Sequence, residues 1–406
     1  MDLEKLKLTP LKKVIHKLEK SLLPIKTEVF SNIDESVSRV LFEDVVSKLD
    51  NPPFDNSAID GYAIKIDEEI PQQSFKILKG RSTPGKPFNG KINRTEALRV
   101  LTGAKVPSGT NKIIFDEEVS VDGDILSLNL RNERSSNIRL KGEDIKKGQI
   151  IFNKGYSIKE TDMPALIASG NSQLSTYSRL RVGLLKTGTE IEEKKLQVSK
   201  TSILDANGPP LTALFNKWGF EVVQLGNIKD NLEAIKDKLN RNLNNIDVII
   251  TTGGASSGEE DFISKLLLSE GEVYAWKVAI KPGRPIIMGS WEGKHLFGLP
   301  GNPVAAFVCA LIFLRPSLGR IAGEKSWFEP LSFKVGAAFE KSKKIGRTEF
   351  LRGRLEENNT VSVFPFEGSG RLTSLAWSNG LVRIEDNISN VEIGDKLNFI
   401  PYSCFG

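Results

Sequence analysis

Apolar residues repeat at helical spacing near the start of the chain. One face of this segment carries Leu11, Val14, Ile15, Leu18 and Leu22. Thr9 and Pro10 stand before it, and these residue types are typical of an N-cap and a first helical position. We therefore expect a helix that begins at Pro10.

The pattern becomes β-like after Asn51-Pro52-Pro53, which forms a rigid, extended stretch. From there to about Gly148, short runs alternate between apolar and polar residues, and Asp122-Gly123 is typical of a hairpin turn. This alternation predicts a β-rich region.

A third pattern begins near Arg181. Short apolar runs at 182–185, 222–225 and 248–250 alternate with helical patterns, which Asp205 and then Asp230 or Asn231 can cap. This order predicts a parallel sheet covered by helices. After about Ser326, short runs at 361–363, 381–384 and 397–400 predict a small β-barrel or sandwich.

Composition narrows the class of protein. The 406 residues suffice for about two to four domains, and 39% hydrophobic with 26% charged residues is ordinary for a globular protein. The longest apolar run, 304–314, falls short of the roughly 18 residues of a membrane span and is followed by Arg315 and Pro316. The N-terminus lacks the apolar core of a signal peptide. We expect a cytoplasmic protein that is not in a membrane.

The few cysteines and histidines restrict the metal chemistry. Cys309 and Cys404 cannot build a disulfide framework or a cysteine-rich metal site, and His16 and His295 make a histidine zinc site improbable. Any metal should then be a hard cation held by carboxylates, with Mg²⁺ as the first candidate.

The charge is mildly basic. The net charge is +5, and basic residues are spread along the chain apart from short runs such as Lys341, Lys343 and Lys344. This distribution suits a small polyanion as well as nucleic acid, and we expect no nucleic-acid partner.

A glycine-rich segment follows the third predicted strand. Residues 251–258 read TTGGASSG and precede a helix that should start near Glu260. At the carboxyl end of a parallel strand, glycines and a helix N-terminus suit an anion, although a plain tight turn is the alternative. Glu190, Asp230 and Asp261 lie at the same kind of edge, where they could hold Mg²⁺ or serve only as helix caps.

Two further segments carry polar chemistry. Lys277 and Lys281 would share one face if their segment is extended, and Arg284 could add a forked donor for an oxyanion. A solvated charged strand is the alternative. The segment 53–63, which includes Asp60, is rich in carboxylate, amide and hydroxyl groups, and a polar turn network is the alternative there.

Together these segments resemble the molybdopterin molybdenumtransferase family, which includes MoeA and the gephyrin E domain. The matching motifs are PPFDNSAIDGYA at 52–63, LTGAKVP at 101–107, NIRLKGEDI at 137–145, KTGTEI at 186–191, TTGGASSGEEDF at 251–262, WKVAIKPGRP at 276–285, GLPGNPVA at 298–305 and GRTEFLRG at 346–353. They run in order across nearly the whole chain.

The resemblance implies an α/β multidomain fold with four domains. These are an elongated domain from two segments (1–47 and 147–179), an inserted β-rich domain (48–146), a three-layer α/β pterin-binding domain with a parallel-type sheet (180–326) and a C-terminal β-barrel (327–406). It also implies a homodimer with a composite active site, in which the Asp60 domain of one subunit completes a cleft on the α/β domain of the other.

The resemblance also assigns site residues. The pterin-binding set is Thr252, Gly253, Gly254, Ser256, Asp261 and Lys277. The set linked with activity is Asp60, Thr102, Asp144, Glu190 and Asp230. The set we assign to molybdate is Lys281, Arg284, Arg352 and Ser369, and the Mg²⁺ set is Glu190, Asp230 and Asp261. Departures from the family pattern at Thr189, Ala255, Ser257, Phe262 and Arg284 roughly keep size or charge.

The expected reaction is insertion of molybdate into adenylated molybdopterin with release of AMP, the last step of molybdenum-cofactor biosynthesis. Asp60 and Asp144 would act from the neighbouring subunit and position water. Two alternatives are a molybdopterin adenylyltransferase, which uses the same α/β fold, and a gephyrin-like scaffold. Other cofactor-synthesis enzymes are further expected partners.

Overall fold

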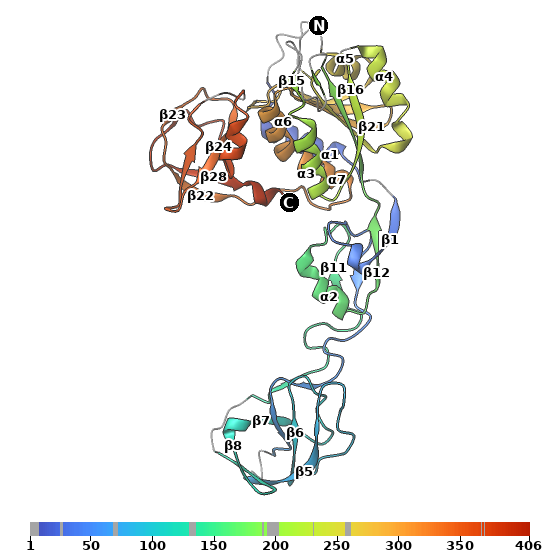
Figure 1. Ribbon diagram of the computed structural model, residues 1–406, viewed down its shortest axis with the longest axis vertical. Coiled ribbons are helices and arrows are strands. Elements are labelled where there is room, and N and C mark those ends of the chain that lie inside the picture. Colours follow the sequence, from blue (N-terminus) through green and yellow to red (C-terminus); the bar gives the residue numbers. More distant parts are fainter. Residues whose placement is uncertain are drawn as a thin grey trace.

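The structure is a computed structural model of the chain. It describes residues 8–24, 27–67, 72–129, 135–188, 191–192, 203–229, 231–255, 261–366, 368 and 370–406. Figure 1 shows an α/β body and a β-barrel side by side at one end, a small unit below them, and a separate β-sheet at the far end. The expected multidomain α/β fold with a C-terminal barrel is confirmed.

A six-stranded sheet forms the centre of the α/β body. Its order is β16 (Glu221–Ile228), β13 (Arg181–Thr187), β17 (Val248–Thr252), β21 (Lys294–Leu299), β20 (Ile287–Trp291) and β18 (Glu272–Trp276). The first four strands are parallel, and β20 runs antiparallel to both of its neighbours. The predicted parallel sheet is therefore correct for the part that contains the glycine-rich segment.

Helices cover both faces of this sheet. Val248 and Ile250 pack in a cluster with α1 (Leu11–Ser21), α3 (Gly208–Lys217) and the helices after β21, whereas Ile249 packs on the opposite side with α4 (Leu232–Asn240) and α5 (Phe262–Glu270). Successive strand residues point to opposite faces, so a strand buried on both faces is apolar throughout. This explains the unbroken apolar runs in the sequence.

The apolar stretch after β21 is longer than its sequence suggests. Helix α6 (Pro303–Cys309), a π-helical turn (Ala310–Leu314) and α7 (Arg315–Ile321) join into one helix, Pro303–Ile321. This 19-residue helix is long and apolar enough to cross a membrane, but 83% of its apolar window is buried inside the protein. Arg315 and Pro316, which we expected to break the apolar run, instead lie inside this helix. The helix changes to a π-helical turn just before Pro316, which lacks a backbone N–H, and Arg315 is paired with Glu324 at 3.0 Å.

The unit below the body is built from two chain segments. β1 (Glu28–Asn32) pairs with β12 (Gln173–Tyr177), β2 (Val45–Val46) pairs with β11 (Ile150–Phe152), and α2 (Met163–Ala168) packs beside them. Helix α1 was expected in this unit as part of 1–47, but its buried Leu11, Val14 and Leu18 join the core of the α/β body. Thr9 also differs from its expected capping role, because it bridges Val278 and Pro10 is the N-cap.

The unit at the far end is built around a six-stranded β-sheet. Its order is β7 (Lys112–Phe115), β4 (Gly61–Ile64), β6 (Glu96–Val100), β5 (Ser74–Ser82), β9 (Ile125–Leu128) and β8 (Val119–Asp122), and β3 (Asn56–Ser57) pairs with β10 (Ile138–Arg139) beside it. The predicted hairpin turn joins β8 to β9. Figure 1 places this sheet beyond the two-segment unit, away from the α/β body.

The C-terminal strands close into a barrel. They are β22 (Phe333–Ala337), β24 (Thr348–Leu355), β25 (Thr360–Val363), β26 (Gly380–Ile384) and β28 (Lys396–Pro401), with the short β23 (Lys341–Ser342), β27 (Asn390–Val391) and α8 (Thr373–Trp377) alongside. Closure is complete because β26 pairs with both β24 and β28.

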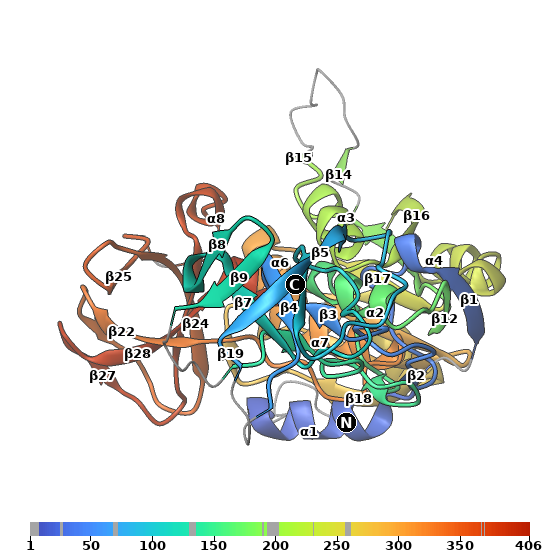
Figure 2. The ribbon, with the colours of Figure 1, turned by 90° about the horizontal axis from the view of Figure 1, so that it is seen from below.

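The barrel is tied firmly to the α/β body. Strand β19 (Ile280–Lys281), which follows β18 of the body, pairs in parallel with β24 of the barrel. Phe350 and Leu381 of the barrel also pack in the main core cluster of the body. Figures 1 and 2 show the two units side by side in both views.

Candidate active site

The glycine-rich segment makes a sharp turn at the end of β17. Gly253 and Gly254 have φ angles of 90° and 66°, in the left-handed region that favours glycine. A Cβ on Gly253 would lie 2.5 Å from the carbonyl oxygen of Thr187, which ends β13. The backbone of this loop can therefore approach both a neighbouring strand and a ligand only because Gly253 has no side chain.

Asp261 lies where the loop enters α5, and its carboxylate does not cap that helix. It occupies the N-cap position, but no side-chain cap hydrogen bond forms there. The amide of Ser264 instead donates to the carbonyl of Gly254 at 3.1 Å. In α4 the cap is Asn231, which accepts from Ala234. The alternative that Asp261 is only a cap is therefore not supported.

Four members of the predicted sets, Glu190, Asp230, Ser256 and Ser369, lie outside the described residues. Within the described part of the chain, no group of three or more His, Cys, Asp or Glu side chains could hold a metal ion. The expected Mg²⁺ set therefore has only Asp261 among the described residues, half-buried beside the glycine loop. Carboxylate oxygens at this position fit a hard cation chemically.

Lys277 does not share an extended face with Lys281, as we had expected. Its φ angle is 55°, so the chain turns between β18 and β19 and the alternation of side chains is lost. The Lys277 ammonium lies 4.8 Å from the centre of the Trp276 ring, whose Nε1 donates to the carbonyl of Ala255. Trp276 thus connects Lys277 to the glycine loop, whereas Lys281 lines a cavity next to the barrel.

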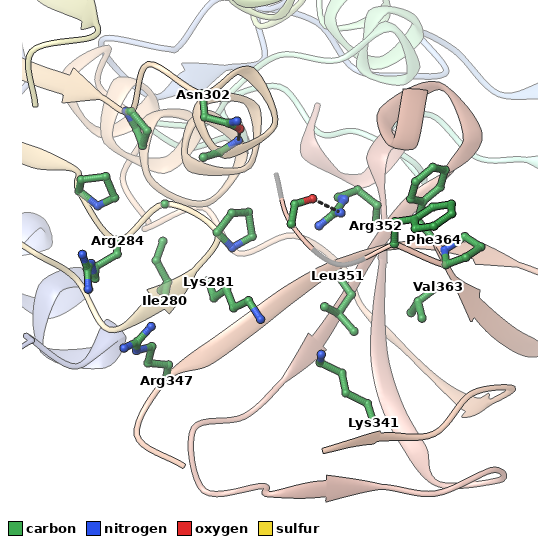
Figure 3. A pocket seen from close by; sticks show the side chains of 18 of the residues that line it. Ile280, Lys281, Arg284, Asn302, Lys341, Arg347, Leu351, Arg352, Val363 and Phe364 are labelled. Carbon is green, nitrogen blue, oxygen red and sulfur yellow. Dashed lines mark hydrogen bonds between the residues drawn. The ribbon is translucent and has the colours of Figure 1, made fainter. Parts of the chain in front are cut away.

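A cavity of about 630 Å³ lies between the α/β body and the barrel. Its polar lining includes Lys281, Arg284, Asn302, Lys341, Arg347 and Arg352. Figure 3 shows these side chains coming from both units. The sequence placed three of them, Lys281, Arg284 and Arg352, in one anion-binding set, and the structure brings those three to the same cavity.

Arg352 is held in a fixed position in this cavity. It is only 5% exposed, its Nε donates to Ser374 Oγ at 3.2 Å, and its Nη2 donates to the carbonyl of Gly368 at 2.9 Å. A planar guanidinium held in this way presents its donors in a defined direction. Ser369 follows Gly368 directly but lies outside the described residues.

The cavity and the glycine loop adjoin one another. Gly301 lines the cavity, and a Cβ on Gly301 would lie 3.8 Å from the Cα of Gly253. The carbonyl of Gly301 accepts a hydrogen bond from Asn207 at 2.8 Å, and Asn302 caps α6 by accepting from Ala305. The spacing of the loop at 298–303 gave no indication of its role. In the structure this loop lies between the glycine loop and the cavity and contacts both.

Several charged residues of this region were not predicted as site residues from the sequence. Lys341 and Arg347 line the cavity, and Glu349 lies behind it in contact with Lys281 and Lys341. Burial lowers the pKa of the neighbouring Lys343, and the negative charge of Glu349 opposes that shift. The signal was the short lysine run next to the GRTEF motif, which we had noted only as a feature of the charge distribution.

Asp60 and Thr102 contact each other on the far sheet. One oxygen of the Asp60 carboxylate accepts from both the amide and the hydroxyl of Thr102, each at 2.7 Å. The backbone hydrogen bond from Thr102 is the main cause that lowers the pKa of Asp60, although both residues are exposed. Asp144 accepts from the side chain of Asn51 at 2.8 Å instead. Figure 1 places this sheet away from the glycine loop.

Comparison with known proteins agrees with this arrangement. Family models match in order: the MoeA N-terminal region (domain I and II) at 9–170, a probable molybdopterin binding domain at 183–320, and the MoeA C-terminal region (domain IV) at 334–402. A molybdopterin molybdenumtransferase of Haemophilus influenzae is 33% identical over 95% of this chain and 96% of that protein. One from Staphylococcus epidermidis is 27% identical over 98% and 97%.

A solved structure shows the same fold. The molybdopterin biosynthesis MoeA protein of Pyrococcus horikoshii superposes with a TM-score of 0.83 at 26% identity and covers 98% of this chain and 100% of that one. Sequence and structure thus match along the whole described chain, through all three family regions. The chain belongs to the molybdopterin molybdenumtransferase (MoeA) family.

Proposed function

We propose that this protein is a molybdopterin molybdenumtransferase, which inserts molybdate into adenylated molybdopterin and releases AMP in the last step of molybdenum-cofactor biosynthesis. The observation that carries the proposal is the cationic cavity next to the glycine loop. Gly301 adjoins both, so an anion in the cavity would be close to a ligand on the loop. The names of the relatives support the same activity.

The glycine loop and the cavity would bind different ligands. The glycine loop, with Thr252, Gly253, Gly254, Ser256 and Lys277, would bind the pterin nucleotide through backbone amides and one ammonium. Lys281, Arg284, Arg352 and Ser369 would bind molybdate. A tetrahedral dianion needs several convergent donors, and the fixed guanidinium of Arg352 supplies parallel donors that a lysine does not.

We assign Mg²⁺ to Asp261 together with Glu190 and Asp230. When bound, the metal would neutralise the negative charge that develops as the phosphoanhydride is cleaved. The position of Asp261 beside the loop, with a carboxylate that is not used as a helix cap, supports this assignment. The chain itself supplies binding and orientation, and none of the assigned roles requires a covalent nucleophile.

We further propose that the enzyme is a homodimer and that its active site is composite. In this arrangement the partner subunit's Asp60, Thr102 and Asp144 face the glycine loop. Two observations support it. The far sheet extends away from the body of its own chain (Figure 1), and the large apolar side chains of Ile150 and Ile167 are 50% and 59% exposed on the two-segment unit.

Both alternatives explain less of the molecule. An adenylyltransferase built on the α/β body alone has no use for a cavity completed by the barrel. A scaffold does not need a buried arginine and two lysines around one cavity. We keep the four domain bounds, with α1 (Leu11–Ser21) moved to the α/β body. The cytoplasmic location and the contact with other cofactor-synthesis enzymes are further parts of the proposal.

The proposal is tested by mixing the purified protein with adenylated molybdopterin, Mg²⁺ and molybdate and measuring AMP. We expect AMP release that depends on molybdate. A second mixture contains molybdopterin, ATP and Mg²⁺. Formation of adenylated molybdopterin and pyrophosphate there, with no molybdate-dependent AMP release in the first mixture, would identify an adenylyltransferase instead.

A further inference from the structure

A buried carboxylate lies between two lysines behind the cationic cavity. Oε1 of Glu349 is 3.7 Å from the ammonium of Lys281, and Oε2 is 3.5 Å from that of Lys341. The side chains of Glu349 and Lys341 are each 6% exposed, whereas that of Lys281 is 41% exposed. Both lysines line the cavity and Glu349 does not, so the carboxylate supports the wall from behind.

The three residues come from three strands and from both units. Lys281 is on β19, which extends from the α/β body, and its register partner on β24 is Glu349. Lys341 is on β23 of the barrel. Figure 3 shows Lys281 and Lys341 approaching the same part of the cavity near Leu351. The position of the Lys281 ammonium relative to Glu349 and Lys341 therefore depends on how the barrel meets the body.

Burial makes the two charges at Glu349 and Lys341 depend on each other. A buried ion is strongly disfavoured unless an opposite charge or hydrogen bonds compensate it. Among the described residues, no group donates a hydrogen bond to Oε2 of Glu349. The carboxylate is therefore compensated by nearby ammonium groups, Lys341 at 3.5 Å from Oε2 and Lys281 at 3.7 Å from Oε1. Without the carboxylate, the buried Lys341 would lose a compensating negative charge, so we expect its ammonium to be held less firmly in the wall of the cavity.

We propose that Glu349 is a positioning residue of the oxyanion site, which holds Lys281 and Lys341 as a pair of ammonium groups, and that Lys341 binds molybdate with Lys281. The triad carries one net positive charge in the wall of the cavity. This inference rests on the proposed molybdate site.

The first test compares Glu349→Gln with Glu349→Asp by equilibrium dialysis against molybdate. Glu349→Gln keeps the shape and removes the charge, and we expect a roughly tenfold weaker affinity, the effect of one lost charge-assisted contact. Glu349→Asp keeps the charge on a shorter side chain and should lose less. Unchanged or tighter molybdate binding by Glu349→Gln would overturn the proposal, since the carboxylate would then only repel the anion.

A second test separates positioning from simple support of the fold. The double variant Glu349→Gln with Lys341→Met removes both charges, so its melting temperature should recover toward the wild-type value. Its molybdate affinity should stay about tenfold weak, because the ammonium is gone. Recovery of molybdate affinity together with the melting temperature would show a purely structural role and overturn the proposal.

The assay also distinguishes this inference from the proposed function. In AMP release, we expect Glu349→Gln to raise the molybdate concentration for half-maximal rate and to leave the rate at saturating molybdate nearly unchanged. A wild-type protein that binds molybdate in dialysis but releases no AMP would contradict the proposed reaction, while the dialysis of the variants would still decide the role of Glu349. A wild-type protein that binds no molybdate would overturn the inference.

Discussion

The cavity beside the barrel and the Asp60 surface are built in opposite ways. The cavity is enclosed by two units of one chain that share a core, and its Arg352 is buried and held by two hydrogen bonds. Asp60 and Thr102 are exposed on a sheet at the other end of the chain. A single chain can thus preorganise the anion site, whereas the Asp60 surface requires a second surface to become part of an enclosed site.

The largest expected effect comes from mixing two inactive variants of the proposed dimer. Asp60→Ala and Asp261→Ala should each abolish most AMP release, and subunits mixed after exchange should recover activity, because each mixed dimer has one intact composite site. The measurement is AMP release before and after exchange, with exchange shown by two affinity tags. Full subunit exchange without recovery would place Asp60 outside a shared site.

The glycine loop tests how rigid the α/β side must be. Gly253→Ala and Gly293→Ala both introduce a side chain at positive φ, a strain of about 1–2 kcal/mol. Only Gly253 faces a neighbour, Thr187 O at 2.5 Å, while Gly293 has open space. We expect Gly253→Ala to lose about 1–3 kcal/mol more in the free energy of unfolding, from overpacking, and to lose pterin-nucleotide binding.

Chemical denaturation and nucleotide binding measure both effects for the pair. Gly293→Ala, on a turn far from the loop in sequence, serves as the matched control and should bind the nucleotide normally. Equal losses in both variants would mean that the close approach to Thr187 has no energetic consequence.

Substitutions of Arg352 compare a fixed guanidinium with the point charge of a lysine. Arg352→Lys should raise the molybdate concentration needed for AMP release, and Arg352→Ala should raise it further, by roughly ten- to a hundredfold for a lost charge-assisted hydrogen bond of about 1.5–3 kcal/mol. Pterin-nucleotide binding should change little. Equal damage to both ligands would mean that Arg352, which also contacts Ser374, mainly supports the barrel.

The smallest expected effect concerns the ionisation of Asp60. Its pKa is lowered chiefly by the Thr102 backbone amide and then by the Thr102 hydroxyl. A lowered carboxylate pKa stabilises the folded state above the ordinary pKa, and this contribution disappears as the pH falls through the lowered value. Thr102→Val removes only the hydroxyl, so the pKa should rise part of the way toward its ordinary value.

An NMR titration of the Asp60 carboxyl carbon measures that shift. Thr110→Val is a suitable control, because the Thr110 hydroxyl donates to the Pro107 carbonyl and not to Asp60. An unchanged pKa in Thr102→Val would show that the amide alone sets the ionisation of Asp60 and that this surface is less organised than its geometry indicates.

Much of the fold was predictable because local patterns carry it. The runs at 182–185, 222–225 and 248–250 became β13, β16 and β17, since a strand covered on both faces must be apolar throughout. The turn at Gly253 could also be predicted from the sequence, because only glycine tolerates positive φ so close to a neighbouring carbonyl. The motif resemblance supplied the identity of Arg352 and Lys281 as anion-site residues.

The tertiary structure alone decided which charged groups meet. Sequence spacing placed Lys277 with Lys281, but the positive φ at Lys277 separates them and leaves Lys277 beside Trp276. It also gave no sign that Lys281 would meet Glu349, because that contact exists only where β19 joins the closed barrel. Local periodicity depends on residues a few positions apart, whereas the position of a buried charge depends on strands from distant parts of the chain that pack together only in the folded protein.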